Sequence, residues 1–214
     1  MLDAAGLEPG LTRFWLVRHA LVEENARARL YGVRDVPLCP ESLVVQAPMY
    51  QALARRLPTE ARWLVTPLSR TRRTADAIAR WRPSVPELVV EPGLIEQDLG
   101  DWQGLAHADL PPRLAKPAHP FWPVAADERP PGGESFADVC ARVGTTMERL
   151  AALHGGQEVV AVSHGGAIRA AAAHALGLTP AQALLFSVQN LSVTVLERHS
   201  HQWRVVAINE LPGL

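Results

Sequence analysis

Short, continuous runs of apolar residues alternate along this chain with longer segments in which apolar residues recur every three or four positions. The run FWLV at residues 14–17 has no polar member, which is typical of a strand buried on both faces of a sheet. The short runs predict strands at about 14–17, 63–65, 87–90, 158–162, 192–198 and 203–208. The longer segments predict helices at about 42–57, 67–80, 134–153 and 166–176.

Strands and helices that alternate in this way indicate an α/β fold. We expect three layers, in which a mainly parallel, doubly wound sheet of about six strands is flanked by helices and the last two strands form an antiparallel edge. No linker divides the chain, so we predict a single domain over residues 1–214. The prolines of residues 105–131 exclude a long helix or strand, and this stretch is predicted to be an insertion, or lid, over one edge of the sheet.

Two prolines bear on the helix boundaries. Thr66 directly before Pro67 is typical of an N-cap followed by the first helical residue. Pro48 falls inside the predicted helix at 42–57 and is expected to interrupt it, because proline lacks the N–H that a helix interior needs.

Charge and composition exclude some kinds of partner and location. The formal net charge is -1, so no basic field favours nucleic acid or an anionic membrane. No apolar run reaches the roughly 18–20 residues of a membrane span, and residues 1–10 lack the regions of a signal peptide. Cys39 and Cys140 lie in no metal-binding spacing and are expected to be reduced thiols, which predicts a cytoplasmic protein. A homodimer is left open.

Charged and titratable side chains follow several predicted strands at the point where each strand ends. They are Arg18 and His19 after the first strand, Arg70 after the second, Glu96 after the third, and His164, Gly165 and Gly166 after the strand at 158–162. Any one of them alone is more often a surface group. Because ligands bind beyond the carboxyl ends of parallel strands, their shared position predicts a site.

The chemistry that fits this set of residues is the binding and transfer of a phosphoryl group. Two guanidinium groups hold phosphate oxygens without titrating, and helix N-termini after residues 66 and 164 would add backbone N–H groups. A neutral imidazole can attack phosphorus, while a carboxyl group protonates the leaving oxygen and then activates water. The cations supply the charge stabilisation, so neither a metal nor a cofactor is expected.

Several stretches resemble motifs of the histidine phosphatase superfamily, also called the phosphoglycerate mutase-like family. LVRHA at 16–20 resembles the LVRHG signature, and VVAVSHGGAIRA at 159–170 is similar to the V-x-SHGG-x-IR stretch. Three further stretches match in the family's order, namely NARARLYGVRDVPL at 25–38, TPLSRTRRTA at 66–75 and LIEQDLGDWQG at 94–104.

The resemblance implies a role for each candidate residue. His19 would be the nucleophile that accepts the phosphoryl group, and Glu96 would be the proton donor. The implied phosphate pocket consists of Arg18, Asn25, Arg70, His164 and Gly165. Several positions depart from the family pattern: Ala20 replaces a glycine, Leu21 and Val22 stand where Glu and Thr are common, and Tyr31 and Arg73 replace glutamines. These departures leave the physiological substrate unassigned.

The implied activity is that of a metal-independent phosphomonoesterase, which hydrolyses a small-molecule phosphate ester through a phosphohistidine and releases inorganic phosphate. Two alternatives on the same fold stay open, a cofactor-dependent phosphoglycerate mutase and a non-catalytic phosphate-binding module. The mutase is disfavoured because Glu96 is followed by QDLGDWQG, whereas mutases usually continue with a basic, Tyr-containing segment.

Two segments have open interpretations. PGGESFADVCARV at 131–143 resembles a segment of small phosphatases and alpha-ribazole phosphatases, or it is simply a helix start with Ser135 or Glu134 near the N-terminus. The insertion at 105–131 either roofs the active site and shapes a leaving-group pocket or is an inert surface loop. The residues of this insertion that could shape such a pocket are His107, His119, Phe121 and Trp122.

Overall fold

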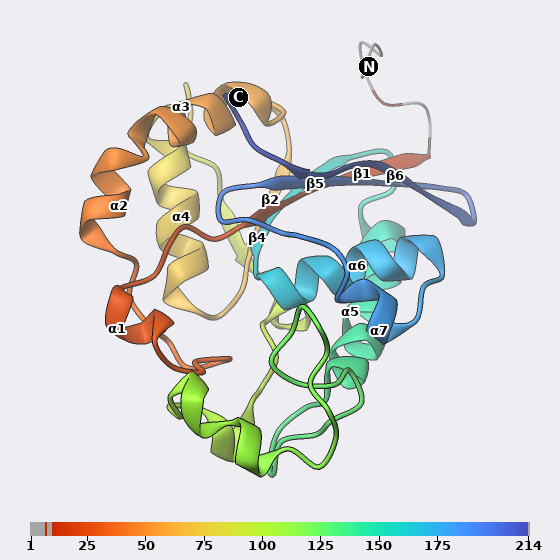
Figure 1. Cartoon of the computed structure of the whole chain (residues 1–214). Coiled ribbons are helices and arrows are strands. Elements are labelled where there is room, and N and C mark those ends of the chain that lie inside the picture. The colour runs from red at the N-terminus through yellow and green to blue at the C-terminus, as the bar shows by residue number, and fades with distance from the viewer. Residues whose placement is uncertain (1–6, 8–9, 214) are drawn as a thin grey trace.

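The computed structural model describes residue 7 and residues 10–213. Within this part of the chain, six strands form one mixed sheet in the order β3-β2-β4-β1-β5-β6 (Figure 1). The strands are β1 (Leu11–Arg18), β2 (Arg62–Val65), β3 (Leu88–Val90), β4 (Glu158–Ser163), β5 (Val193–His199) and β6 (Gln202–Glu210). Strands β1 to β4 pair in parallel, whereas β5 is antiparallel to both β1 and β6. The predicted sheet, with its antiparallel edge, is confirmed. The signal-peptide prediction for residues 1–10 falls, except for Leu7 and Gly10, outside the described residues.

Helices cover both faces of the sheet (Figure 1). Their bounds are α1 (Glu24–Arg27), α2 (Pro40–Val45), α3 (Ala47–Arg56), α4 (Ser69–Ala79), α5 (Phe136–Leu153), α6 (Gly165–Leu176) and α7 (Pro180–Ala183). Helices α3 and α4 pack on one face, while α5, α6 and α7 pack on the other. The three-layer prediction is therefore confirmed. No helix among the described residues is long and apolar enough to cross a membrane.

The first strand is the centre of the core. Phe14 and Leu16 belong to the apolar cluster shared with α5 and α6, whereas Trp15 and Val17 belong to the cluster shared with α3 and α4. Successive side chains of a strand point to opposite faces, so a strand between two helical layers needs apolar residues at every position. The unbroken FWLV run follows from this requirement.

The expected interruption near Pro48 is confirmed: the helix predicted at 42–57 is divided at Gln46 into α2 and α3, and Pro48 lies in the first turn of α3. The predicted start of the next helix is wrong. Thr66 is not an N-cap, because α4 begins only at Ser69. The Ser69 N–H donates to Asp35 Oδ1 at 2.9 Å, so the first N–H of this helix is occupied by a side chain of the protein.

The start of α5 decides one interpretation of residues 131–143. Ser135 is the N-cap: its hydroxyl accepts from the Asp138 N–H, and the Asp138 carboxylate accepts from the Ser135 N–H. This is a capping box, which satisfies two N–H groups that the helix itself leaves unpaired. The stretch is thus a helix start, with Glu134 directly before the cap.

Residues 105–131 contain only short 3₁₀ turns, at His107–Asp109 and Pro111–Arg113, as the prolines predict. The segment is nevertheless anchored. The Leu30 N–H donates to Leu105 O at 2.9 Å, and Arg29 pairs with Ala106 in an isolated bridge. A small apolar cluster joins it to the rest of the molecule, formed by Leu30, Trp102, Leu110 and Val124.

Candidate active site

The site lies where β1 and β4 end side by side. Arg18 pairs in register with Ser163, so the residues that follow, His19 and His164, emerge together. Their rings lie 5.2 Å apart between centroids, at 62° to each other. The backbone of His19 is tied on both sides, because its N–H donates to Ser163 O at 2.9 Å and its carbonyl accepts from Asn190 Nδ2 at 2.7 Å. The sheet register therefore places both imidazoles.

The tautomer of His19 follows from a single contact. Its Nδ1 lies 2.7 Å from the carbonyl oxygen of Ala20. A carbonyl oxygen can only accept, so Nδ1 carries the proton and Nε2 keeps a free lone pair. Burial, together with the charges of Arg70 and Arg18, holds the pKa of His19 well below its usual value. The ring is consequently neutral and nucleophilic at Nε2.

Three buried polar atoms near this imidazole lack partners among the described residues. They are Arg18 Nε, Arg70 Nε and His164 Nδ1. An unpaired buried donor costs about 1–3 kcal/mol, and such atoms in a native fold call for an explanation. The charges of Arg18 and Arg70 act on both imidazoles, so these groups lie near one another, and two guanidinium N–H groups with an imidazole nitrogen are suited to an anion.

Each of these three side chains is otherwise held in place. Arg18 Nη1 donates to Val188 O at 2.5 Å. The two terminal nitrogens of Arg70, which is fully buried, donate to Arg34 O at 2.8 Å and Gly32 O at 2.7 Å. Backbone carbonyls thus hold Nη1 of Arg18 and both terminal nitrogens of Arg70, while the Nε of each guanidinium remains free for a ligand.

His164 is oriented by Thr66, the residue predicted to be a helix cap. Its Nε2 lies 2.9 Å from Thr66 Oγ1, whose hydroxyl can donate to it and so leave the proton on Nδ1. Burial and the charge of Arg70 hold the pKa of His164 well below its usual value. A neutral His164 can then donate from Nδ1 to an anion beside His19.

Glu96 lies in the loop after β3 and reaches the start of α6. Its carboxylate accepts from Gly166 N at 3.2 Å and from Gln97 N at 3.0 Å. A Cβ at position 166 would collide with Glu96 Oε1, so only glycine allows this approach. The N-terminal N–H of α6 thus holds a carboxylate of the protein.

An ion pair outside the site fixes the Glu96 loop. Arg142 of α5 forms a bidentate pair with Glu134, at 2.9 Å for both nitrogens, and donates from Nη1 to Gly93 O at 2.9 Å and Ile95 O at 3.2 Å. Glu134 Oε2 in turn accepts from Asp98 N at 3.2 Å. The start of α5 therefore braces the loop on both sides of Glu96.

A cavity of about 230 Å³ is lined by some of these residues, whereas His19, Arg70 and His164 are buried and are not part of its lining. Arg18, Glu96 and Gly165 line it from the sheet edge. Four residues of the predicted lid line it from the other side, namely His107, Trp122, Pro123 and Val124. Part of residues 105–131 therefore lines this cavity, whereas Phe121 is 72% exposed and does not line it. A role of the segment as roof of the site stays a prediction.

The remaining predicted residues differ in placement. Asn25 lies on α1 with an exposed side chain and does not line this cavity. Gly165 does line it, and a Cβ there would lie 2.9 Å from Arg169 Nη1 and 3.4 Å from Arg18 Cζ. Glycine is thus needed where two guanidinium groups approach the backbone.

Ala20 and Val22 are buried in the core cluster of α3 and α4, which explains apolar residues at those positions.

Sequence reasoning missed Arg169. It lines the cavity from α6, and the available signal was its position four residues after Gly165, which places both on one face of the helix.

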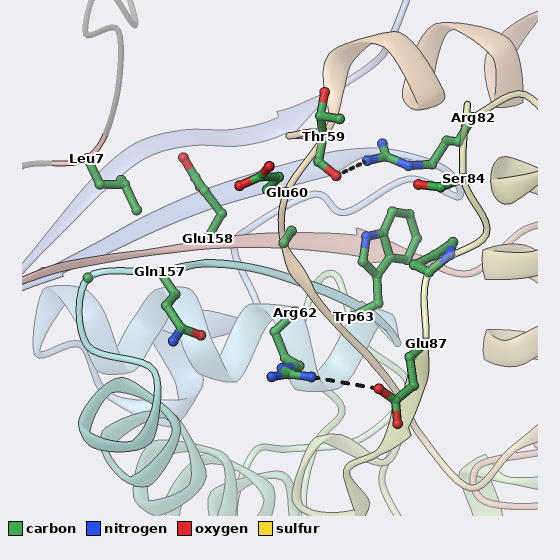
Figure 2. A pocket seen from close by; sticks show the side chains of 13 residues that line it. Leu7, Thr59, Glu60, Arg62, Trp63, Arg82, Ser84, Glu87, Gln157 and Glu158 are labelled. Atoms are coloured by element: carbon green, nitrogen blue, oxygen red, sulfur yellow. Dashed lines mark hydrogen bonds and ion pairs between the residues drawn. The ribbon is translucent and has the colours of Figure 1, made fainter.

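A larger hollow, of about 670 Å³, lies at the opposite edge of the sheet, where β2 and β4 begin (Figure 2). Both of its arginines already have partners: Arg62 pairs with Glu87 at 3.9 Å, and Arg82 donates to Thr59 O at 3.0 Å. None of the unpartnered buried atoms found in the described residues lies there. The smaller cavity is therefore the better candidate. In the same part of the chain, no group of three or more His, Cys, Asp or Glu residues could hold a metal ion.

Comparison with known proteins agrees with this geometry. The family model of the histidine phosphatase superfamily (branch 1) matches residues 14–211. A metal-independent phosphoserine phosphatase of Arabidopsis thaliana is 31% identical, over 97% of this chain and 85% of the relative. A 2,3-bisphosphoglycerate-dependent phosphoglycerate mutase of a Methylobacterium species is 34% identical, over 77% of this chain and 80% of the relative. The solved structure of a mycobacterial glucosyl-3-phosphoglycerate phosphatase has a TM-score of 0.79 and 30% identity, and the match covers 94% of this chain and 99% of that one.

The tautomer and charge of His19 can be measured directly. ¹⁵N NMR of the free protein should show the proton on Nδ1, and the ring should stay neutral at pH 6, because its pKa is held below the ordinary value near 6.5. His201, exposed in the turn between β5 and β6, provides the reference signals of a solvent-accessible ring. A His19 ring that is protonated at pH 6, or that carries its single proton on Nε2, would contradict this description.

The brace on the Glu96 loop predicts a local effect. Arg142→Met removes both carbonyl contacts and frees Glu134, so exchange of the Asp98 amide should accelerate by at least roughly tenfold. Arg129→Met is the matched control, since Arg129 pairs with Asp138 at the surface and contacts no part of that loop. Equal rates of Asp98 amide exchange in the two variants would show that Arg142 does not hold the Glu96 loop in place.

Proposed function

The chain belongs to the histidine phosphatase superfamily, and we propose that its phosphatase activity proceeds by transfer of the phosphoryl group of a small phosphate monoester to His19. The observation that carries this proposal is the neutral imidazole with a free Nε2, beside three buried polar atoms that lack partners. A tetrahedral phosphate would satisfy all three atoms at once and present its phosphorus to the nucleophile.

In the proposed first step, His19 Nε2 attacks phosphorus and the ester oxygen leaves. Arg18 and Arg70 donate from Nε to the phosphoryl oxygens, on which charge is redistributed in the transition state. His164 donates from Nδ1 to the same group. These donors are fixed before substrate arrives, so no reorganisation is needed at the moment of reaction.

Glu96 must be protonated when attack begins: it would give this proton to the leaving oxygen, and the resulting carboxylate would then accept one from the water that attacks the phosphohistidine. Hydrolysis returns neutral His19 and releases inorganic phosphate. The two guanidinium groups supply the stabilisation that a cation would otherwise give, which supports a reaction without a metal. Activity should accordingly persist in EDTA.

Other assignments belong to the same proposal. Asn25 would turn towards the bound phosphate and add a hydrogen bond, and Gly165 would let the backbone approach it. Residues 105–131 would act as the roof of the leaving-group pocket within a single domain, which the continuous family match over 14–211 supports. A cytoplasmic location agrees with two unpaired cysteines, and a homodimer remains a prediction.

A phosphoglycerate mutase is the second candidate, because one relative carries that name. A mutase must return the phosphoryl group to an organic acceptor, whereas a phosphatase gives it to water. Release of inorganic phosphate from 3-phosphoglycerate, without 2-phosphoglycerate, would decide for the phosphatase.

The covalent step predicts a trapped intermediate. Incubation with a ³²P-labelled substrate followed by rapid denaturation should leave acid-labile phosphate on His19, because phosphoramidates survive base and not acid. His19→Gln should abolish the label. His201→Gln, on the exposed β5–β6 turn, should retain it. Turnover of the His19 variant at a rate near that of the wild type would exclude the mechanism, as well as a role for His19 as nucleophile.

The role of Glu96 predicts a dependence on the leaving group. An alkyl alcohol leaves poorly without a proton, whereas p-nitrophenolate leaves well alone. In single-turnover formation of phosphohistidine, Glu96→Gln should therefore slow an alkyl phosphate by about 10²–10⁴-fold and p-nitrophenyl phosphate far less. Asp101→Asn, exposed in the same loop, is the control. Equal losses on both substrates would remove Glu96 as the acid and leave Asp98 as the next candidate.

A further inference from the structure

Arg169 stands between two hollows of the molecule. With Arg18 it lines the cavity beneath the lid, and the same two residues line a second hollow of about 640 Å³ towards Leu211–Gly213. Its place on α6, one turn after Gly165, puts it next to the phosphate site without making it part of that site. None of the proposed phosphate contacts requires it.

The guanidinium group of Arg169 is positioned before any ligand binds. Its Nε donates to Phe186 O at 2.8 Å, and its Cζ lies 4.8 Å from the centre of the Trp122 ring. Among the residues that the structure describes, neither terminal nitrogen makes a hydrogen bond or an ion pair. Stacking on Trp122 covers one face of the group, so a ligand must approach the edge that carries Nη1 and Nη2.

The charge of this group is unbalanced. Burial, together with the charge of neighbouring Arg18, lowers the pKa of Arg169 to about 10, while the carboxylate of Glu96 opposes both effects. The side chain remains protonated at neutral pH. In the proposed function a phosphate group engages Arg18 and Arg70, and Glu96 is the one carboxylate that lines this cavity. A partly buried cation beside another cation then lacks a counter-charge.

We propose that Arg169 is a specificity-determining residue that binds a carboxylate on the leaving group of the substrate. The planar guanidinium of Arg169, with donors free on Nη1 and Nη2, matches one carboxylate in charge and in shape. The apolar wall of Leu30, Trp102 and Val124 would cover the carbon skeleton between the two anionic groups. The substrate class is thus a short phosphate monoester of a hydroxy acid or amino acid. This inference rests on the proposed function.

Matched pairs of esters test the role of Arg169. O-phosphoserine and O-phosphoethanolamine differ only by the carboxylate, and 3-phosphoglycerate and glycerol 3-phosphate form a second pair. Wild-type kcat/KM should favour the acid in at least one pair by roughly tenfold or more. Arg169→Gln should bring that ratio close to one, mainly through KM, and Arg169→Lys should restore part of it because a cation returns. Arg29→Gln is the matched control. Arg29 is an exposed arginine that lines the same cavity and donates to Gly104 O, and its replacement should leave the wild-type ratio of kcat/KM values unchanged.

The outcomes separate this inference from the proposed function. A wild-type ratio near one in both pairs, together with rapid turnover of p-nitrophenyl phosphate, would overturn the carboxylate role and leave the phosphatase intact. If Arg169→Gln lowered kcat/KM equally for both esters of a pair, Arg169 would serve only to hold Trp122 and Phe186 in place. No turnover of any ester, p-nitrophenyl phosphate included, would overturn the proposed function and the carboxylate role with it.

Discussion

The parallel pairing of β1 with β4 is the constraint on which the site depends. It sets Arg18 against Ser163 and so delivers His19 and His164 to one point, 5.2 Å apart. The strands can hold this register because apolar side chains pack on both faces of β1, and a slip by one residue would move every one of them to the wrong layer. The core thus provides the positional precision that the imidazoles need.

That burial also has an electrostatic consequence. The same packing that orders the site removes water from His19, His164 and Arg70, and it lowers the pKa values of both imidazoles. Keeping the rings neutral and the donors unpaired lowers the free energy of unfolding of the free protein, by about 1–3 kcal/mol for each unsatisfied group. An anion that pairs with these donors removes this destabilisation when it binds. The site is therefore organised for its ligand at the expense of the stability of the free protein.

Much of this arrangement could be predicted from the sequence, because strand ends in a parallel sheet share one edge. His19, Arg18, Arg70, Glu96 and His164 lie at this edge as expected. The helix start at Thr66 was wrong because a tertiary contact with His164 outweighs the local capping preference. Arg169 was missed because a guanidinium on a helix looks like any exposed arginine until Trp122, 47 residues earlier in the chain, is seen to cover it. The brace by Arg142 likewise depends on a long-range contact that no local pattern encodes.

The central claim is that the three unpartnered atoms around His19 form a prepared phosphoryl site. A crystal structure with orthovanadate, which mimics a five-coordinate phosphoryl transition state, tests it most directly. The account predicts vanadium bonded to His19 Nε2, with Arg18 Nε, Arg70 Nε and His164 Nδ1 as donors to its oxygens. Vanadate bound elsewhere, or bound here while those three atoms remain without partners, would contradict it.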